Sequence, residues 1–131
     1  MGIRTLVAAG ERNRGRVVDL LRSAGGYTLV AEAPDGVTAV LLAERHQPDL
    51  VVIAAELPEL GGIEATAPIR SRLPDSTIVV LTRSAGGRLA MRAGADRSVP
   101  MESPDEAIVA AVQGALPVQL RGRVSNGVHR L

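Results

Sequence analysis

Two patterns of apolar and polar positions alternate along the chain. Short, nearly continuous apolar runs predict strands, and each is followed by a stretch with apolar residues at helical spacing. The predicted strands are Ile3–Ala9, Tyr27–Ala33, Asp49–Ala55, Thr77–Thr82 and Ala95–Val99; the predicted helices are Arg12–Ala24, Val37–His46, Ile63–Arg72, Arg83–Arg92 and Ser103–Ala115. Apolar residues at consecutive positions are typical of strands covered on both faces. Five strand–helix units within 116 residues therefore predict a parallel sheet with helices on both sides.

The first predicted helix is amphipathic. Arg16, Leu20 and Ala24 fall on one line of it, and Gly25-Gly26 marks its end.

Two other helices carry predicted N-terminal caps. Asp35, in the turn Pro34-Asp35-Gly36, is expected to cap the second helix. Ser103 and Glu106 have the spacing of a capping box, with Pro104 at the first helical position of the last helix.

The last 15 residues, 117–131, depart from the alternating pattern. They contain three arginines and scattered apolar residues, with Asn126-Gly127 as a candidate hairpin turn. We therefore predict a domain over residues 1–116 and a C-terminal tail or linker over 117–131. Packing of this tail on its own domain and packing on a neighbouring copy are both open.

Composition excludes several classes of function. The chain has 131 residues and a formal net charge of +1, and all 15 basic residues are arginine. The absence of cysteine excludes disulfides, thiolate zinc sites and cysteine nucleophiles, and the absence of lysine excludes Schiff-base chemistry. Tyr27 is the only aromatic residue, so bases of a single-stranded nucleic acid have almost nothing to stack on. The near-neutral charge gives no reason to expect direct nucleic-acid binding.

The apolar stretches are too short for a membrane span. The longest have six residues, such as Leu50–Ala55, against the roughly 20 that a bilayer requires. The N-terminus has no signal-peptide layout, so a cytoplasmic protein without membrane contact is expected.

Several strings, taken in order, resemble response-regulator receiver domains. They are Ala33-Pro34-Asp35-Gly36, Pro48-Asp49-Leu50-Val51-Val52-Ile53, Leu57-Pro58-Glu59-Leu60-Gly61-Gly62-Ile63-Glu64-Ala65, Ile78-Val79-Val80-Leu81-Thr82 and Arg92-Ala93-Gly94-Ala95-Asp96. The resemblance covers about residues 3–116 and is closest to receivers of helix-turn-helix DNA-binding regulators. It implies a flavodoxin-like, doubly wound α/β fold of five strand–helix units.

The resemblance also implies a chemistry, phosphoryl transfer from a histidine kinase to an aspartate at the end of the third strand. In the family an acidic pair after the first strand holds Mg²⁺, and a lysine after the fifth strand contacts the phosphoryl group. Carried over by position, the acid pair falls on Ala9 and Gly10, the phosphoacceptor on Ala54 and the lysine on Met101. The switch positions fall on Thr82 and Ser98, and of all these positions only Thr82 keeps the family's residue type.

These departures predict a site that neither accepts a phosphoryl group nor binds a metal. Alanine has no nucleophilic oxygen, and without nearby carboxylates Mg²⁺ loses its ligands. A shifted role for Glu11 and Glu56 is a weaker alternative, because isolated glutamates are usually solvated.

Glu56 and Arg83 suggest a filled rather than an empty site. An ion pair between them would take the place of the phosphoryl–lysine contact and fix one conformation. The plainer interpretation, which we weight more heavily, is that both are exposed and never meet.

Arginines at positions 88, 92 and 97, together with Arg83, lie on the predicted fourth helix and fifth strand. Receivers use this face for dimers and partners. Two interpretations of this face are equally supported. It is either a docking surface for an acidic partner or a second copy, or a charged face that is only solvated.

We therefore predict a non-enzymatic, phosphorylation-independent receiver-like domain without cofactors. It would act through protein–protein contacts or as a homodimer in bacterial signal transduction or transcriptional control. Two alternatives are open. One is the receiver portion of a two-component DNA-binding regulator. The other is a small-molecule sensor that uses the vacated cleft around Ala9, Gly10, Ala54 and Ala55.

Overall fold

The computed structural model describes residues 2–83 and 86–124. It contains one five-stranded parallel sheet with the order β2-β1-β3-β4-β5. The strands are β1 (Ile3–Ala8), β2 (Tyr27–Ala33), β3 (Leu50–Ala54), β4 (Thr77–Thr82) and β5 (Arg97–Pro100). The helices are α1 (Glu11–Ala24), α2 (Gly36–His46), α3 (Gly62–Arg72), α4 (Gly87–Ala93), α5 (Asp105–Ala115) and the short α6 (Val118–Arg121). This confirms the predicted doubly wound, flavodoxin-like α/β fold.

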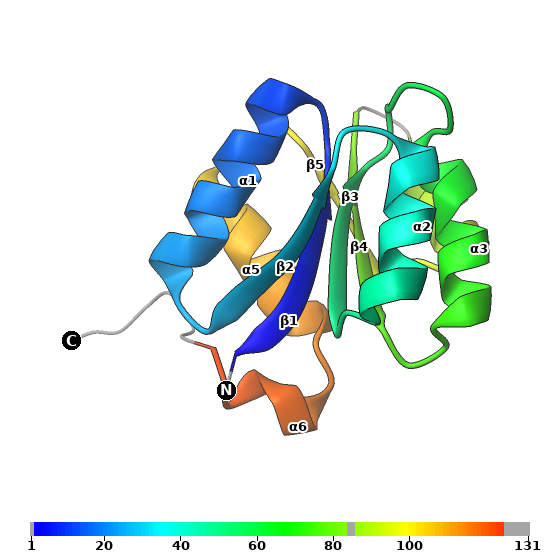
Figure 1. Cartoon of the computed structure of the whole chain (residues 1–131). Helices are drawn as coiled ribbons and strands as arrows, with labels where there is room; N and C mark the ends of the chain where they lie inside the picture. Colours follow the sequence, from blue (N-terminus) through cyan, green and yellow to red (C-terminus); the bar gives the residue numbers. More distant parts are fainter. Residues whose placement is uncertain (1, 84–85, 125–131) are drawn as a thin grey trace.

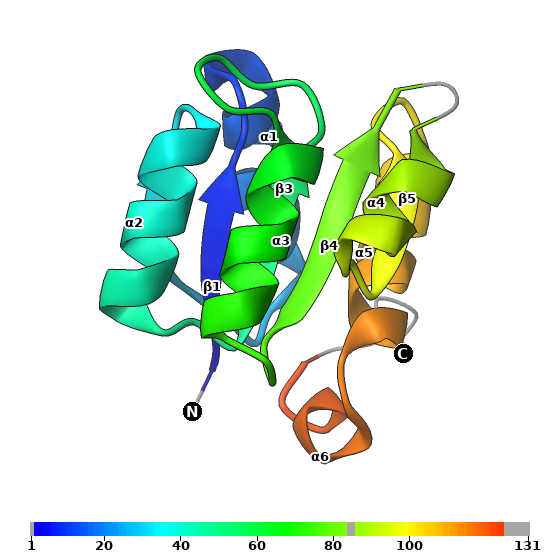
Figure 2. The same cartoon turned by 90° about the vertical axis from the view of Figure 1, so that its right-hand side faces the viewer.

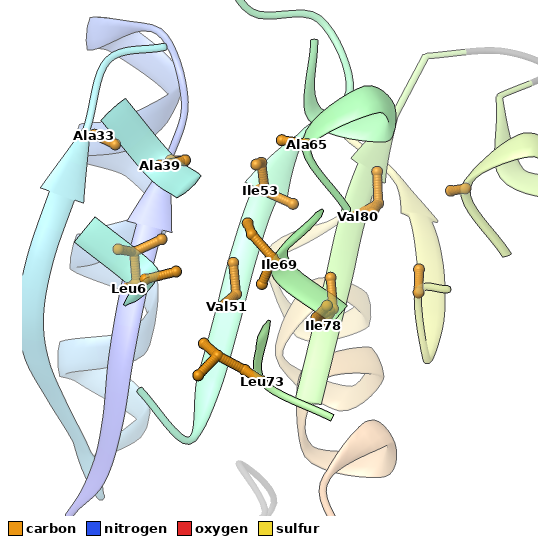
Figure 3. Close-up of a cluster of buried hydrophobic side chains, with 14 residues drawn as sticks. Leu6, Ala33, Ala39, Val51, Ile53, Ala65, Ile69, Leu73, Ile78 and Val80 are labelled. Atoms are coloured by element: carbon orange, nitrogen blue, oxygen red, sulfur yellow. The ribbon is translucent and has the colours of Figure 1, made fainter. Parts of the chain in front are cut away.

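Helices cover both faces of the sheet, as Figures 1 and 2 show, with α1 and α5 on one face and α2, α3 and α4 on the other. Two aliphatic cores result. Figure 3 shows the core under α2 and α3, where Val51 and Ile53 of β3 meet Ile69 of α3. The neighbouring β3 residues Leu50 and Val52 face the core under α1 and α5. All five residues of β3 are buried, so its consecutive apolar residues are explained by cover on both faces.

The predicted cap of α2 is present, and that of α5 is wrong. The Asp35 carboxylate accepts a hydrogen bond of 2.7 Å from the Thr38 backbone N–H. At α5, Pro104 is itself the N-cap, with ψ of 153°, and no side chain caps the helix. Because this extended conformation keeps Pro104 outside the helix, α5 begins at Asp105, and Ser103 and Glu106 form no capping box.

The other large differences from the predicted boundaries lie around α4, whereas the remaining ends agree to within one residue. The helix begins at Gly87 rather than Arg83, and β5 spans Arg97–Pro100 rather than Ala95–Val99. Gly94 has a φ of +116° and Ala95 still donates to the Ala90 carbonyl, so the turn that ends α4 extends into the positions where the strand was expected to begin.

The C-terminal segment packs on its own domain as far as residue 124. Leu120 and Val124 pack against the α1–α5 core. The Arg121 guanidinium donates to the carbonyls of Gly114 and Leu116. The candidate turn at Asn126-Gly127 lies outside the described residues. None of the described helices combines the length and the apolar character needed to cross a bilayer.

Candidate functional site at the carboxyl edge of the sheet

The carboxyl ends of the parallel strands meet at one edge of the sheet, and this edge holds the candidate site (Figure 2). Ala9 and Gly10 follow β1, Ala54 ends β3, Thr82 ends β4 and Met101 follows β5. From β1 the chain continues to β2 on one side, and from β3 it continues to β4 on the other side. Open α/β sheets bind ligands at such a change of direction, which lies here between β1 and β3. The fold thus brings together the positions that the sequence singled out.

The four positions at the centre of this edge carry no ionisable side chain. Ala9 is fully buried, Ala54 is 4% exposed, and both present only a methyl group. Gly10 has no side chain, and the thioether of Met101 is partly buried. Within residues 2–83 and 86–124, no three His, Cys, Asp or Glu side chains are grouped so as to hold a metal ion.

The turn after β1 is held by an arginine from the next helix. Arg14 Nη1 donates a hydrogen bond of 2.9 Å to the carbonyl oxygen of Ala9. Its Nε lies 3.3 Å from a carboxylate oxygen of Glu32 on β2. A guanidinium therefore occupies the neighbourhood in which the resemblance implies carboxylates.

Glu56 and Arg83 meet at the rim of the site. Glu56 Oε1 lies 3.5 Å from Arg83 Nη1, with side chains 67% and 69% exposed. The plainer interpretation, that the two side chains never meet, is therefore wrong for this structure. At this exposure the pair is of the kind that contributes little to stability. Beside it lies a cavity of about 70 Å³, lined by Asn13, Ala54, Glu56, Leu81, Arg83 and Met101.

The two switch positions lie under the start of α4. Thr82 is 2% exposed, and a side chain at Gly86 would contact its Cβ. Ser98 pairs with Val80 across β4 and β5, and its hydroxyl would lie 2.9 Å from a Cβ at Gly87. Both positions therefore touch the segment that leads into α4.

The candidate interaction residues are divided between solvent and the domain itself. Arg88 and Arg92 are exposed on α4. Arg97 Nη2 donates a hydrogen bond of 3.2 Å to the Gly114 carbonyl at the end of α5. Leu89 and Met91, which no sequence motif marks, are 57% and 46% exposed on α4. A short helix with exposed apolar residues between arginines is the most evident surface for a partner on this face.

Two arginines to which the sequence alone assigned no role make the densest polar contacts of the described residues. Arg16 of α1 donates to the carbonyls of Met101 and Ser103 and to the carboxylate of Asp105. Arg70 of α3 donates to three carbonyls and to Asp96. The position of Arg16 on the same line of α1 as Leu20 was the available signal, because a half-buried arginine needs hydrogen-bond acceptors close by.

Comparisons with known proteins agree with this geometry. The family model of the response regulator receiver domain matches residues 9–113. A protein-glutamate methylesterase/protein-glutamine glutaminase of Myxococcus xanthus is 37% identical over 112 residues, covering 79% of this chain and 32% of the relative. The transcriptional regulatory protein PdtaR of Mycobacterium tuberculosis is 44% identical over 80 residues, covering 60% of this chain and 38% of the relative.

A solved structure of a LuxR-family two-component response regulator from Aurantimonas sp. SI85-9A1 superposes with a TM-score of 0.80 and 31% identity. The superposition covers 95% of this chain and 89% of the solved chain. The chain spans about a third of the length of the two curated relatives. The chain belongs to the response regulator receiver domains, the signalling modules of two-component systems that act through partner proteins.

Proposed function

We propose that this chain is a phosphorylation-independent receiver domain that acts through protein–protein contacts and is not an enzyme. The observation that carries the proposal is the methyl group of Ala54 at the end of β3, where the family resemblance requires an aspartate. A methyl group cannot attack phosphorus, so no aspartyl phosphate forms at that position.

The surrounding residues do not fit the Mg²⁺ that the family's chemistry requires. This ion needs oxygen ligands, whereas Ala9 and Gly10 provide no side-chain oxygen. Glu11 is exposed at the start of α1, and the Glu56 carboxylate is turned toward Arg83. These contacts support the loss of the metal site rather than its rescue by the two glutamates.

The exposed surface of α4 is the proposed contact face. Arg88 and Arg92 supply guanidinium groups, and Leu89 and Met91 supply apolar area between them. Arginine and methionine are enriched at the centres of interfaces. The occupant is either a second copy of this chain or a protein partner with an acidic, partly apolar surface. Direct nucleic-acid binding by this chain is not part of the proposal, because the net charge is only +1.

The decisive experiment is a phosphoryl challenge. The melting temperature and the molar mass by light scattering are measured with and without beryllofluoride and Mg²⁺, and phosphorylation by acetyl phosphate is followed by intact mass. We expect no change in any of the three. A shift in melting temperature, a change in oligomeric state or the gain of a phosphoryl group would refute the proposal.

A substitution pair tests the contact face separately. Leu89→Glu should abolish self-association, or capture of an acidic partner, because it places a carboxylate in the apolar centre of the face. Val118→Glu on α6 is the matched control, since Val118 is also strongly exposed, at 76%, but lies on another element. Equal effects of the two substitutions would argue against α4 as the contact face.

A second candidate is the receiver portion of a DNA-binding two-component regulator. This candidate is favoured by the comparison with PdtaR, because the match covers only 38% of that transcriptional regulatory protein, which therefore has further sequence beyond the matched part. The gene sequence downstream of Leu131 tests it. A helix-turn-helix domain encoded there would establish this function for the parent protein, and a stop codon would exclude it.

The third candidate, a small-molecule sensor, has less support. The cavity beside Ala54 measures about 70 Å³, whereas pockets for drug-sized ligands measure roughly 300–1,000 Å³. A hollow of about 420 Å³ shares Asn13, Arg83 and Met101 with it but is open to solvent, whereas ligand pockets bury most of the ligand surface. A thermal-shift screen of metabolites tests this candidate, because a bound ligand raises the melting temperature by mass action.

A further inference from the structure

Arg16 ties α1 to the loop between β5 and α5. Its Nη1 donates to the Met101 carbonyl at 2.7 Å and its Nη2 to the Ser103 carbonyl at 2.8 Å. Nη2 also lies 3.0 Å, and Nε 3.3 Å, from the same carboxylate oxygen of Asp105. One half-buried guanidinium therefore contacts both ends of the short loop and the first turn of α5.

The same loop is connected to the end of β4. The Met101 backbone N–H donates a hydrogen bond of 2.7 Å to the carbonyl oxygen of Thr82. A continuous chain of contacts thus runs from Thr82, the switch position that keeps the family's residue type, through the backbone of Met101 to Arg16. None of these contacts uses the side chain at position 101.

Arg70 makes a second connection of the same kind at the other end of β5. Its Nε donates to the Gly94 carbonyl at 3.0 Å, and Nη1 donates to the Ser76 carbonyl at 2.6 Å. Its Nη2 lies 2.6 Å from Asp96 Oδ2, which also accepts a hydrogen bond of 2.8 Å from the Ile78 N–H. The turn between α4 and β5 is thereby fixed to both α3 and β4.

We propose that Arg16 and Arg70 are two clamps that hold the segment from Gly94 to Asp105 in one arrangement without any phosphoryl group. This inference rests on the proposed function, because it describes how a receiver without a phosphorylation site keeps its α4–β5–α5 face in a single state. Lysine cannot replace either clamp, since one ammonium group cannot reproduce the several donors of a planar guanidinium.

Hydrogen exchange measured by NMR on the full chain tests the two clamps separately. Arg16→Lys should accelerate exchange at the Met101 and Ser103 amides by about tenfold or more, because it removes hydrogen bonds from a charged donor. Arg70→Lys should do the same at the Ala95 and Asp96 amides. Each substitution should leave the other pair of amides unchanged, because a local opening there keeps the remaining clamp intact. Arg12→Lys, at an exposed position of α1, is the matched control and should change none of them.

Two results would overturn the inference. One is unchanged exchange at Met101 and Ser103 in Arg16→Lys. The other is an equal acceleration at the Ala95 and Asp96 amides in Arg16→Lys, which would show that the arginine stabilises the whole domain and not the loop. If Arg16→Lys does not fold, Asp105→Asn removes the charged part of the clamp alone, and a smaller acceleration at the same two amides is then required.

The unmodified protein in beryllofluoride and Mg²⁺ separates this inference from the proposed function. Altered exchange at Met101 in that sample would refute phosphorylation independence. Unaltered exchange there, combined with no effect of Arg16→Lys, would refute the clamp alone.

Discussion

The Met101 carbonyl oxygen accepts a hydrogen bond of 2.7 Å from Arg16 Nη1, across a separation of 85 residues. Position 101 is where the family resemblance requires a lysine side chain that contacts a phosphoryl group. Here the backbone of that residue is held instead, by an arginine from α1. The loop is hydrogen-bonded through its backbone, although the side chain at 101 carries no charge.

The Glu56–Arg83 ion pair should contribute little to stability. Both side chains are about two-thirds exposed, and such pairs are typically worth about 0–1 kcal/mol. We expect Glu56→Gln to lower the free energy of unfolding by less than about 1 kcal/mol, and the difference should vanish in high salt. Urea denaturation of both proteins at low and high ionic strength measures this. A larger, salt-independent loss would instead support the hypothesis that the pair locks the site.

Tyr27 should give the domain an alkaline limit of stability. Burial raises the pKa of its phenol from 10.0 to about 12, and its hydroxyl has no hydrogen-bond partner among the described residues. The folded state therefore keeps a proton that the unfolded state loses, so the contribution of Tyr27 to stability is constant below pH 10 and falls as the pH rises from 10 to 12.

The composition makes this titration easy to isolate. Tyr27 is the only tyrosine, and lysine and cysteine are absent, so tyrosinate absorbance reports this one group. Tyr27→Phe should remove the fall in stability between pH 10 and pH 12. Below pH 10 it should leave stability equal or slightly higher, because it removes an unpaired buried hydroxyl. A tyrosinate absorbance midpoint near the ordinary value of 10.0 would contradict the burial.

Asp35 should give an acid limit of stability. Hydrogen bonds from the Thr38 backbone and side chain hold the pKa of its carboxyl below the usual 3.8. A lowered pKa contributes stability that is present above the unfolded value and is lost as the pH falls through the folded one. Asp35→Ala should lower the melting temperature at neutral pH, and the difference from the unmodified protein should shrink below about pH 4. Melting curves at a series of pH values check this, and Asp75→Ala, in an exposed turn, is the control.

Gly26 should be required for docking of the C-terminal segment. Its φ is +94°, and a Cβ there would overlap the carbonyl oxygen of Arg123 and lie 2.7 Å from Val124 Cα. At Gly25, with φ of +83°, a Cβ would meet no atom within 4 Å, so Gly25→Ala introduces only the backbone strain of about 1 kcal/mol.

A truncation makes the comparison specific. Gly26→Ala should destabilise the chain more than Gly25→Ala, and removal of residues 117–131 should abolish the difference between them. Chemical denaturation of both glycine variants and their parent, with and without residues 117–131, gives the values. Equal losses before truncation would show that the segment does not rest on Gly26.

The sequence by itself determined the architecture and the chemistry that the site lacks. Consecutive apolar residues such as those of β3 are stable only when both faces are covered, so the strand–helix alternation leads to a doubly wound sheet. That positions 9, 10, 54 and 101 carry no carboxylate or amine is a property of the residues themselves. The cap at Asp35 was equally predictable, because its partner lies three residues away.

The tertiary structure alone decided which groups meet across long separations. The partners of Arg16 and Arg70 are mostly carbonyl groups, which every residue carries, so no residue type marks them in the sequence. The end of α4, the start of β5 and the start of α5 depended on how Gly94 and Pro104 join the elements around them. The C-terminal segment passes over Gly26, where a Cβ would overlap a backbone from the far end of the chain. Local spacing encodes which face is buried, whereas hydrogen-bond partners distant in the chain are fixed only when the packed sheet brings them together.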